Sequence, residues 1–231
     1  MKSPRVSRRL KYYLKENVFE STHDLVPRLY DFAIILIQSN TTGKGLIINF
    51  GCGPFPVELN ARLIHLNEGF STRFLNIDIS RKACTRHKQA MDEMVEKHKN
   101  QFLNDVYLNV DIERVKVQVI RKALNGTEPQ GGLAISFLEY YSPKRAVKFI
   151  TKMLKHCDSL VCSVRIDPEF EKTFDTENRL NLHFFKDLSE LKTNLVHEDW
   201  KIKEIIGVPR FNDGERGIFL MLIKRNQGSP E

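Results

Sequence analysis

Apolar and polar residues follow two patterns along this chain. Short, almost wholly apolar runs are typical of buried strands, and we predict strands over 46–50, 73–79, 106–110, 133–138 and 160–164. Between these runs, apolar residues recur three and four positions apart, as they do on one face of a helix. This pattern predicts helices over 56–66, 81–99, 113–124 and 186–197, and one that opens at Ser142-Pro143. Strands that alternate with helices favour a parallel sheet covered on both faces.

The two ends of the chain depart from this alternation. Amphipathic helices are predicted over 7–20 and 24–38, before the first strand. The apolar face of the second consists of Leu25, Leu29, Phe32, Ile35 and Leu36. At the other end, strands over 200–208 and 217–224 flank the turn sequence Asn212-Asp-Gly214, which predicts an antiparallel hairpin.

These elements together predict an α/β fold: a Rossmann-like, doubly wound, seven-stranded mixed sheet with an N-terminal helical cap. We place the arm and cap at 1–40 and the ligand-binding domain at 41–231. A ligand of such a fold is expected beyond the carboxyl ends of the first strands, where the strand order reverses.

Composition excludes several classes of protein. The 231 residues are 41% hydrophobic and 28% charged, which is typical of an ordinary globular protein rather than a disordered or membrane-spanning one. The longest apolar run, 32–37, is far shorter than the roughly 20 residues of a membrane helix. The four cysteines, Cys52, Cys84, Cys157 and Cys162, form no C-x-x-C pair. We therefore expect free thiols, no metal site and a cytoplasmic location, with no membrane partner.

The net charge of +7 is concentrated at one end of the chain. Residues 1–15 contain six of the 36 bases and no acid, which leaves 30 bases against 29 acids in the remainder. A basic arm of this kind can contact phosphate, although a solvated basic terminus is commoner. The body of the protein is close to neutral, so the charge alone does not indicate a nucleic-acid-binding protein.

The candidate chemistry begins where the first predicted strand ends. Gly51-Cys-Gly53 leaves that strand and enters a helix, the setting of a nucleotide-type glycine turn. Glycine permits a positive φ and a close approach of the backbone to a ligand. Pro54 and Pro56 remove two backbone amides at the point where a pyrophosphate needs donors. The turn therefore suits a ligand without a phosphate clamp, and a nicotinamide-dependent oxidoreductase is the least favoured enzyme class.

Carboxylates follow the next two strands. Asp78 ends the second predicted strand, and Asp111 ends the third in the same relative position. A carboxylate at the first place can accept hydrogen bonds from two ribose hydroxyls, and one at the second can reach an adenine edge. Either acid alone is more often a helix-start residue. Three consecutive strand ends with a glycine turn, an acid and an acid favour a nucleoside-binding site.

This arrangement resembles the class I S-adenosylmethionine-dependent methyltransferases over roughly residues 45–225. The resemblance rests on Ile47-Ile-Asn-Phe-Gly-Cys-Gly-Pro-Phe-Pro56, on Asn76-Ile-Asp78, on Asn109-Val-Asp111 and on the order of the strands. It implies S-adenosylmethionine as cofactor. The cofactor contacts it implies are Gly51, Cys52, Gly53, Pro54, Asp78, Ile79, Asp111, Ile112 and Phe137. Asn49 stands where the family usually has an acid, and Phe55 where a third glycine is common.

Two subfamilies are also similar over shorter stretches. Ser21-Thr-His-Asp24 with the glycine turn looks like the aminoglycoside-resistance ribosomal-RNA methyltransferases, but lacks their usual arginine after the acid. The turn with Asn76-Ile-Asp-Ile79 resembles nicotianamine synthase, which transfers the aminocarboxypropyl group of the same cofactor. Neither similarity identifies a substrate.

The acceptor is expected near the end of the fourth predicted strand, at Glu139-Tyr-Tyr141. Methyl transfer from a sulfonium is an in-line displacement dominated by orientation, so a base helps only if the acceptor must lose a proton. We predict Glu139 as that base and Tyr140 and Tyr141 as aromatic walls. Further candidates lie after the fifth strand; they are Asp167, His183 and the phenylalanines Phe170 and Phe174.

Several functions remain open. The nearly neutral body favours a small-molecule N or O acceptor. The alternatives are an RNA base methyltransferase, an aminocarboxypropyl transferase and a non-catalytic cofactor-binding partner protein. In the RNA case, phosphates would meet the 1–15 arm together with Arg81, Lys82, Arg86 and Lys88.

Overall fold

The computed structural model describes most of the chain. The described residues are 25–40, 46–54, 56, 58, 73–97, 105–135, 137–168, 184–213 and 216–226. Several predictions lie outside them: the 1–15 arm, the helix over 7–20, most of the helix over 56–66, and residues Phe170, Phe174 and His183.

The seven strands form one mixed sheet in the order β3-β2-β1-β4-β5-β7-β6. Their bounds are β1 Leu46–Phe50, β2 Arg73–Asp78, β3 Val106–Asn109, β4 Gly131–Ala134, β5 Ser159–Ile166, β6 Trp200–Asp213 and β7 Arg216–Arg225. The first five are parallel, and β7 lies antiparallel between β5 and β6. The predicted doubly wound mixed sheet is confirmed, and the strand order reverses between β1 and β4.

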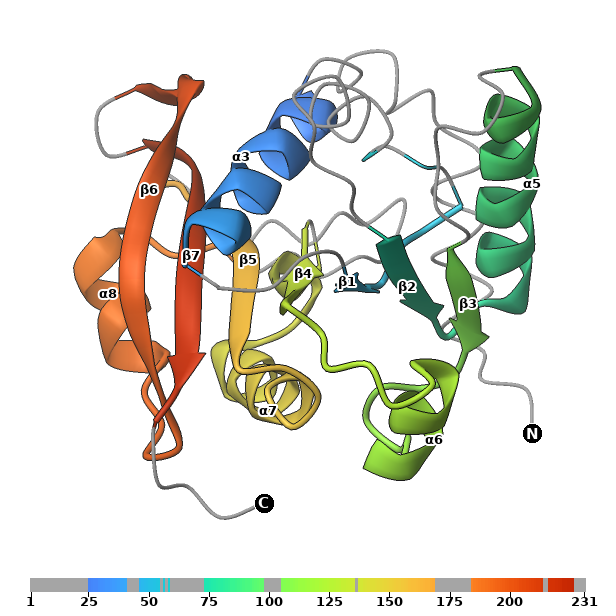
Figure 1. Ribbon diagram of the computed structural model, residues 1–231. Helices are drawn as coiled ribbons and strands as arrows, with labels where there is room; N and C mark the ends of the chain where they lie inside the picture. Colours follow the sequence, from blue (N-terminus) through green and yellow to red (C-terminus); the bar gives the residue numbers. More distant parts are fainter. Residues whose placement is uncertain are drawn as a thin grey trace.

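Helices cover both faces of this sheet (Figure 1). Their bounds are α3 Leu25–Asn40, α5 Arg81–Lys97, α6 Val117–Ala123, α7 Pro143–Met153 and α8 Leu188–Asn194, with a 3₁₀ turn η1 at Leu138–Tyr140. Ser80 caps α5 as its sequence suggests, since its Oγ accepts from the amide of Ala83 at 3.2 Å. Within the described residues, no helix combines the length and apolar character needed to cross a membrane.

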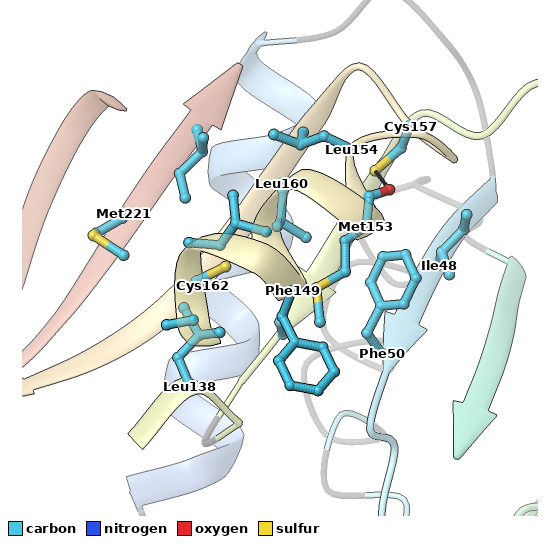
Figure 2. Close-up of a cluster of buried hydrophobic side chains, with 14 of the residues drawn as sticks. Ile48, Phe50, Leu138, Phe149, Met153, Leu154, Cys157, Leu160, Cys162 and Met221 are labelled. Atoms are coloured by element: carbon cyan, nitrogen blue, oxygen red, sulfur yellow. Dashed lines mark hydrogen bonds between the residues drawn. The ribbon is translucent and has the colours of Figure 1, made fainter. Parts of the chain in front are cut away.

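Side chains alternate between the two faces of the central strands. Ile47 points to a layer under α3, whereas Ile48 and Phe50 point to the layer under α7. Figure 2 shows this second layer, in which Phe149 and Met153 of α7 gather with Phe50. Because β1 is buried on both sides, the residues that follow it are held by two cores, and its carboxyl end is a rigid base for the glycine turn.

The helix α3 is rotated relative to its predicted face. Phe32 and Ile35 are exposed, although the apolar rhythm placed them inside. The buried side chains of α3 are instead Leu29, Tyr30, Ala33, Ile34, Leu36 and Ile37. These side chains pack in one hydrophobic layer with β1, β2, β4, β5 and β7. The described part of the predicted cap therefore packs against the sheet of the main fold.

Three predicted boundaries are wrong for local reasons. The strand predicted over 133–138 ends at Ala134; Ile135 and Leu138 are buried outside the sheet, so their apolar character reflects burial alone. The helix predicted from 113 begins at Val117, because the Asp111 side chain accepts from the Glu113 amide at 2.9 Å and holds a turn there. The strand β6 continues to Asp213, into the predicted turn sequence, of which Gly214 lies outside the described residues.

Candidate functional site

The glycine turn has the backbone conformation that its sequence demands. Gly51 and Gly53 have φ values of 72° and 69°, in the left-handed region that disfavours a Cβ. A Cβ at Gly53 would meet no atom of the described residues within 4 Å, so the backbone there faces space that these residues leave open and a ligand can approach it. The turn is thus shaped to receive a ligand at Gly53.

Gly51 needs glycine for a second reason. A Cβ built there would lie 2.6 Å from Cδ2 of Phe137, well inside van der Waals contact. The Phe137 ring is itself held by Tyr141 and Phe149, each with its ring centroid 5.2 Å away. Phe137, predicted as a cofactor contact, therefore packs directly on the glycine turn. The role of Phe137 toward a cofactor stays a prediction.

All three amides of the turn are used inside the protein. Gly51 and Cys52 donate to the Ile77 carbonyl at 2.8 and 3.1 Å. Gly53 donates to Oδ2 of Asp78 at 3.1 Å. Pro54 and Pro56 have no N–H to give. Of the turn residues that the structure describes, none offers a free amide to a phosphate group.

Asp78 joins the turn to the following helix. Its Oδ2 accepts from Gly53, and its Oδ1 accepts from the Ser80 amide at 2.7 Å. Each carboxylate oxygen has two lone pairs and can accept from more than one donor. The side chain is half-buried, at the carboxyl end of β2 beside the open space at Gly53. Asp78 thus has the structural role at a helix start that its sequence position also allowed, together with oxygens that can accept from hydroxyl groups.

Asp111 lies at the same edge of the sheet. β3 ends at Asn109, two residues earlier than Asp111, and Asn109 donates through Nδ2 to the Asp78 carbonyl at 2.9 Å. This bond ties the ends of β2 and β3 together. Asp111 Oδ2 lies 3.6 Å from Nε of the exposed Arg114, and Ile112 is buried in the core. The side chain of Ile79, at the same edge, is 48% exposed.

Asn49, where the resembled family has an acid, belongs to a buried polar chain. The Tyr30 hydroxyl of α3 donates to Asn49 Oδ1 at 3.2 Å, and Asn49 Nδ2 donates to Asn76 Oδ1 at 3.0 Å. Asn76 Nδ2 then donates to Asp105 Oδ2 at 3.4 Å. Burial is the main reason that the pKa of Tyr30 is raised well above its usual value. Asn49 therefore links α3 to the strands below the turn.

A buried pair lies directly under the turn. Nε2 of His87 is 2.9 Å from Oε1 of Glu58, and both side chains are fully buried. Nδ1 of the same ring is 3.3 Å from the Gly53 carbonyl. Sequence reading did not single out this pair. The two residues are 29 positions apart, and no local pattern joins them.

Two thiols complete the support of the turn. Cys52 and Cys84 of α5 are both buried, and all four cysteines of the chain are free. A hydrogen bond between these two thiols raises the pKa of Cys52 and lowers that of Cys84. Cys84 also donates to the Asp78 carbonyl at 3.8 Å. No group of three or more potential metal ligands occurs among the described residues.

The predicted acceptor residues follow β4 in the 3₁₀ turn η1. Glu139 is half-buried in a small pocket that Tyr141 and Arg165 also line. Burial raises the pKa of Glu139, and the charge of Arg165 opposes that rise. Tyr141 packs on Phe149 with centroids 4.4 Å apart, and the Arg145 guanidinium lies over its ring. The side chain of Tyr140 lies outside the described part. Among the further candidates, Asp167 is buried after β5.

Comparison with known proteins gives structural matches only. No protein-family model matches the sequence, and no curated protein matches it significantly. A magnesium protoporphyrin IX methyltransferase from Synechocystis, with bound S-adenosylmethionine, aligns at a TM-score of 0.60 and 12% identity over 97% of this chain and 92% of its own. A small RNA methyltransferase aligns at a TM-score of 0.63 and 14% identity over 90% of this chain and 26% of its own. A Rhodobacter sphaeroides protein, described as a candidate zinc-dependent alcohol dehydrogenase, aligns at a TM-score of 0.57 and 11% identity. The alignment covers 85% of this chain and 90% of that protein.

These matches confirm the predicted fold class. The chain has the Rossmann-like fold of the class I S-adenosylmethionine-dependent methyltransferases, and the resemblance seen in the sequence is confirmed at the level of the fold. The matched proteins differ in what they act on, and one is described as a dehydrogenase. Because one fold hosts many activities, the residues of the site carry the functional argument.

Proposed function

We propose that this protein is an S-adenosylmethionine-dependent methyltransferase. The observation that carries this proposal is the use of the turn amides. The backbone N–H groups of Gly51, Cys52 and Gly53 all donate to the end of β2. Pro54 and Pro56 have no backbone N–H. A dinucleotide needs donors for its pyrophosphate at this place, whereas S-adenosylmethionine has no phosphate. A matched methyltransferase of this fold also contains that cofactor.

The remaining features of the site suit a nucleoside joined to an amino acid. The open space at Gly53 would take the methionine part, and Asp78 would accept hydrogen bonds from the ribose hydroxyls. Asp111, with the backbone of Ile112, would meet the adenine. The exposed side chain of Ile79 would then be covered by the adenosine. The cofactor, when bound, supplies a methyl group on a positively charged sulfur.

Protein residues in such a reaction orient the acceptor and take up a proton where one is released. Glu139 fits the second task, because burial raises the pKa of its carboxyl and makes the carboxylate a better base. Tyr141 would form one wall of the acceptor site. We propose a small-molecule N or O acceptor, because the charge of the body is nearly balanced.

Calorimetry with S-adenosylhomocysteine and with NAD tests the cofactor. We expect micromolar affinity for the first and no measurable binding of the second. Asp78→Ala should weaken cofactor binding at least roughly tenfold, since it removes charge-assisted hydrogen bonds. Asp92→Ala is the matched control, because Asp92 is an exposed carboxylate of α5 paired with Lys88. Tight NAD binding, or equal losses in both variants, would contradict the proposal.

Salt dependence tests the acceptor class. If RNA is the acceptor, its affinity should fall steeply with salt, with a log–log slope of roughly −0.7 per phosphate contacted. Deletion of residues 1–15 should then flatten the slope and leave cofactor binding intact. We expect weak RNA binding in physiological salt. A salt-steep, arm-dependent, nanomolar RNA affinity would instead establish the RNA alternative, and a cofactor-binding protein with no transfer to any acceptor would establish the non-catalytic one.

A further inference from the structure

The number of protons on the His87–Glu58 pair decides which hydrogen bonds the pair can make beneath the glycine turn. The His87 ring touches two acceptors at once: the Gly53 carbonyl at Nδ1 and the Glu58 carboxyl at Nε2. A carbonyl oxygen can only accept, so Nδ1 must carry a hydrogen for the first contact to be a bond. At Nε2, a hydrogen must lie between the ring and Glu58 on one of the two groups. Both contacts are bonds only if the pair holds one proton more than a carboxylate and a neutral imidazole.

Loss of that proton breaks one of the two bonds. If Nδ1 is bare, its lone pair faces the lone pairs of the Gly53 carbonyl at 3.3 Å. If Nε2 is bare, it faces a buried carboxylate instead. Histidine keeps a hydrogen on Nε2 in the deprotonated pair, because an unpaired buried carboxylate is the more costly outcome. The Gly53 bond is therefore the one that is lost.

The surroundings favour retention of the proton. Glu58 Oε2 is buried and has no hydrogen-bond partner among the described residues, so the opposite charge of the ring is its main compensation. Burial by itself lowers the pKa of His87, but Glu58, the Gly53 carbonyl and Asp105 together raise it above its ordinary value. Among the described residues, the other titratable groups near the pair are Cys84 of α5 and Tyr107 of β3 beside the ring, with the Tyr107 ring centroid 5.6 Å away, and Cys52 and Tyr30, which interact with Glu58.

We propose that His87 and Glu58 are positioning residues that hold the glycine turn against α5 only while the pair carries this extra proton. The Gly53 carbonyl is the point of attachment, and it belongs to the residue that faces the open ligand space. A raised pKa means that the stabilisation is complete below the usual value of His, near 6.5, and is lost as pH rises through the raised value. One consequence rests on the proposed function: the affinity for the cofactor should fall over the same pH range.

Hydrogen exchange in the cofactor-free protein tests the anchor directly. The protection factors of the Gly51 and Cys52 amides report how often the turn opens, because each is the intrinsic exchange rate at that pH divided by the observed rate. In the wild type we expect them to fall as pH rises from about 6.5 to the raised pKa of His87, by up to roughly tenfold per pH unit for a single proton, and to level off above that value. In Glu58→Gln the transition should vanish and the turn should stay protected, because the introduced side-chain amide donates to Nε2 and leaves the Nδ1 hydrogen on Gly53. His156→Gln, at a buried histidine elsewhere, should keep the wild-type transition.

The ring itself gives a second measurement that needs no variant. In nitrogen NMR spectra of the wild type, Nδ1 of His87 should be protonated below the transition and lose its hydrogen as turn protection falls. A ring with bare Nδ1 throughout, or turn protection independent of pH in the wild type, would overturn the anchor. Failure of the proposed function has a different signature: S-adenosylhomocysteine would not bind at any pH, while the exchange data of the cofactor-free protein would be unaffected.

Discussion

Replacement of Gly51 by alanine tests whether the glycine turn is shaped by Phe137 as well as by its own dihedral angles. Gly51 and Gly53 have nearly equal φ values, 72° and 69°, so an alanine at either place has the same conformational cost of about 1–2 kcal/mol. Among the described residues, the new Cβ meets another group at Gly51 alone, where the Phe137 ring lies 2.6 Å away. Overpacking of this kind costs about 1–3 kcal/mol more. Gly53→Ala is therefore the matched control.

Thermal and urea denaturation followed by circular dichroism measure the difference. For a domain of this length each kcal/mol shifts Tm by roughly 2–4 °C. Gly53→Ala should lower Tm by roughly 2–8 °C, and Gly51→Ala by roughly 4–20 °C. The added Phe137→Leu substitution should restore part of the loss in Gly51→Ala, because the smaller side chain can retreat from the new methyl group. Equal losses at the two glycines, with no coupling to Phe137, would refute the reasoning.

Three further predictions concern groups around the site and in the core. Tyr30→Phe should cost about 1–3 kcal/mol of unfolding free energy in urea, because the buried Asn49 Oδ1 loses its donor; no loss would mean that the polar chain is not stabilising. His156 is buried with neither ring nitrogen hydrogen-bonded to a described residue, and burial first, then neighbouring bases, lower its pKa to about 4. Wild-type stability should therefore fall as pH drops from about 6.5 to 4, and His156→Phe should reduce this fall by up to about 3 kcal/mol, measured by denaturation across that range. Glu139→Gln should lower kcat roughly 10²–10⁴-fold with cofactor affinity unchanged if Glu139 is the base, and an unchanged kcat would exclude that role.

The N-terminal helix shows where local pattern reaches its limit. The sequence predicted a helix over 24–38, and α3 occupies Leu25–Asn40. The side predicted to face the sheet was wrong at Phe32 and Ile35, because these residues are as apolar as those that are buried. Apolar residues at helical spacing show where a helix lies in the sequence. A helix with apolar residues on most of its surface can, however, pack with different sides against the sheet. Contact with β5 and β7 decides the rotation.

Glu139 shows a second limit. Its apolar neighbours predicted a strand end, yet β4 stops at Ala134 and Glu139 lies in η1. Periodicity reports burial, and a buried loop has the same composition as a buried strand. The role of Glu139 at the acceptor site stays a prediction, which rests on its place after β4 in the chain.

The sequence by itself determined the succession of strands and helices of the α/β fold, the glycine turn and the acid at the end of β2. Each of these features depends on residues close together in the chain. Periodicity marks the strands, Gly51 and Gly53 mark a positive φ, and Asp78 ends an apolar run. Only the tertiary structure decided how the turn is held. The partners of its amides on β2, the Phe137 ring over Gly51 and the Glu58–His87 pair under Gly53 come from distant segments. Such contacts leave no local pattern, because they form only when the sheet brings separate strand ends to one edge.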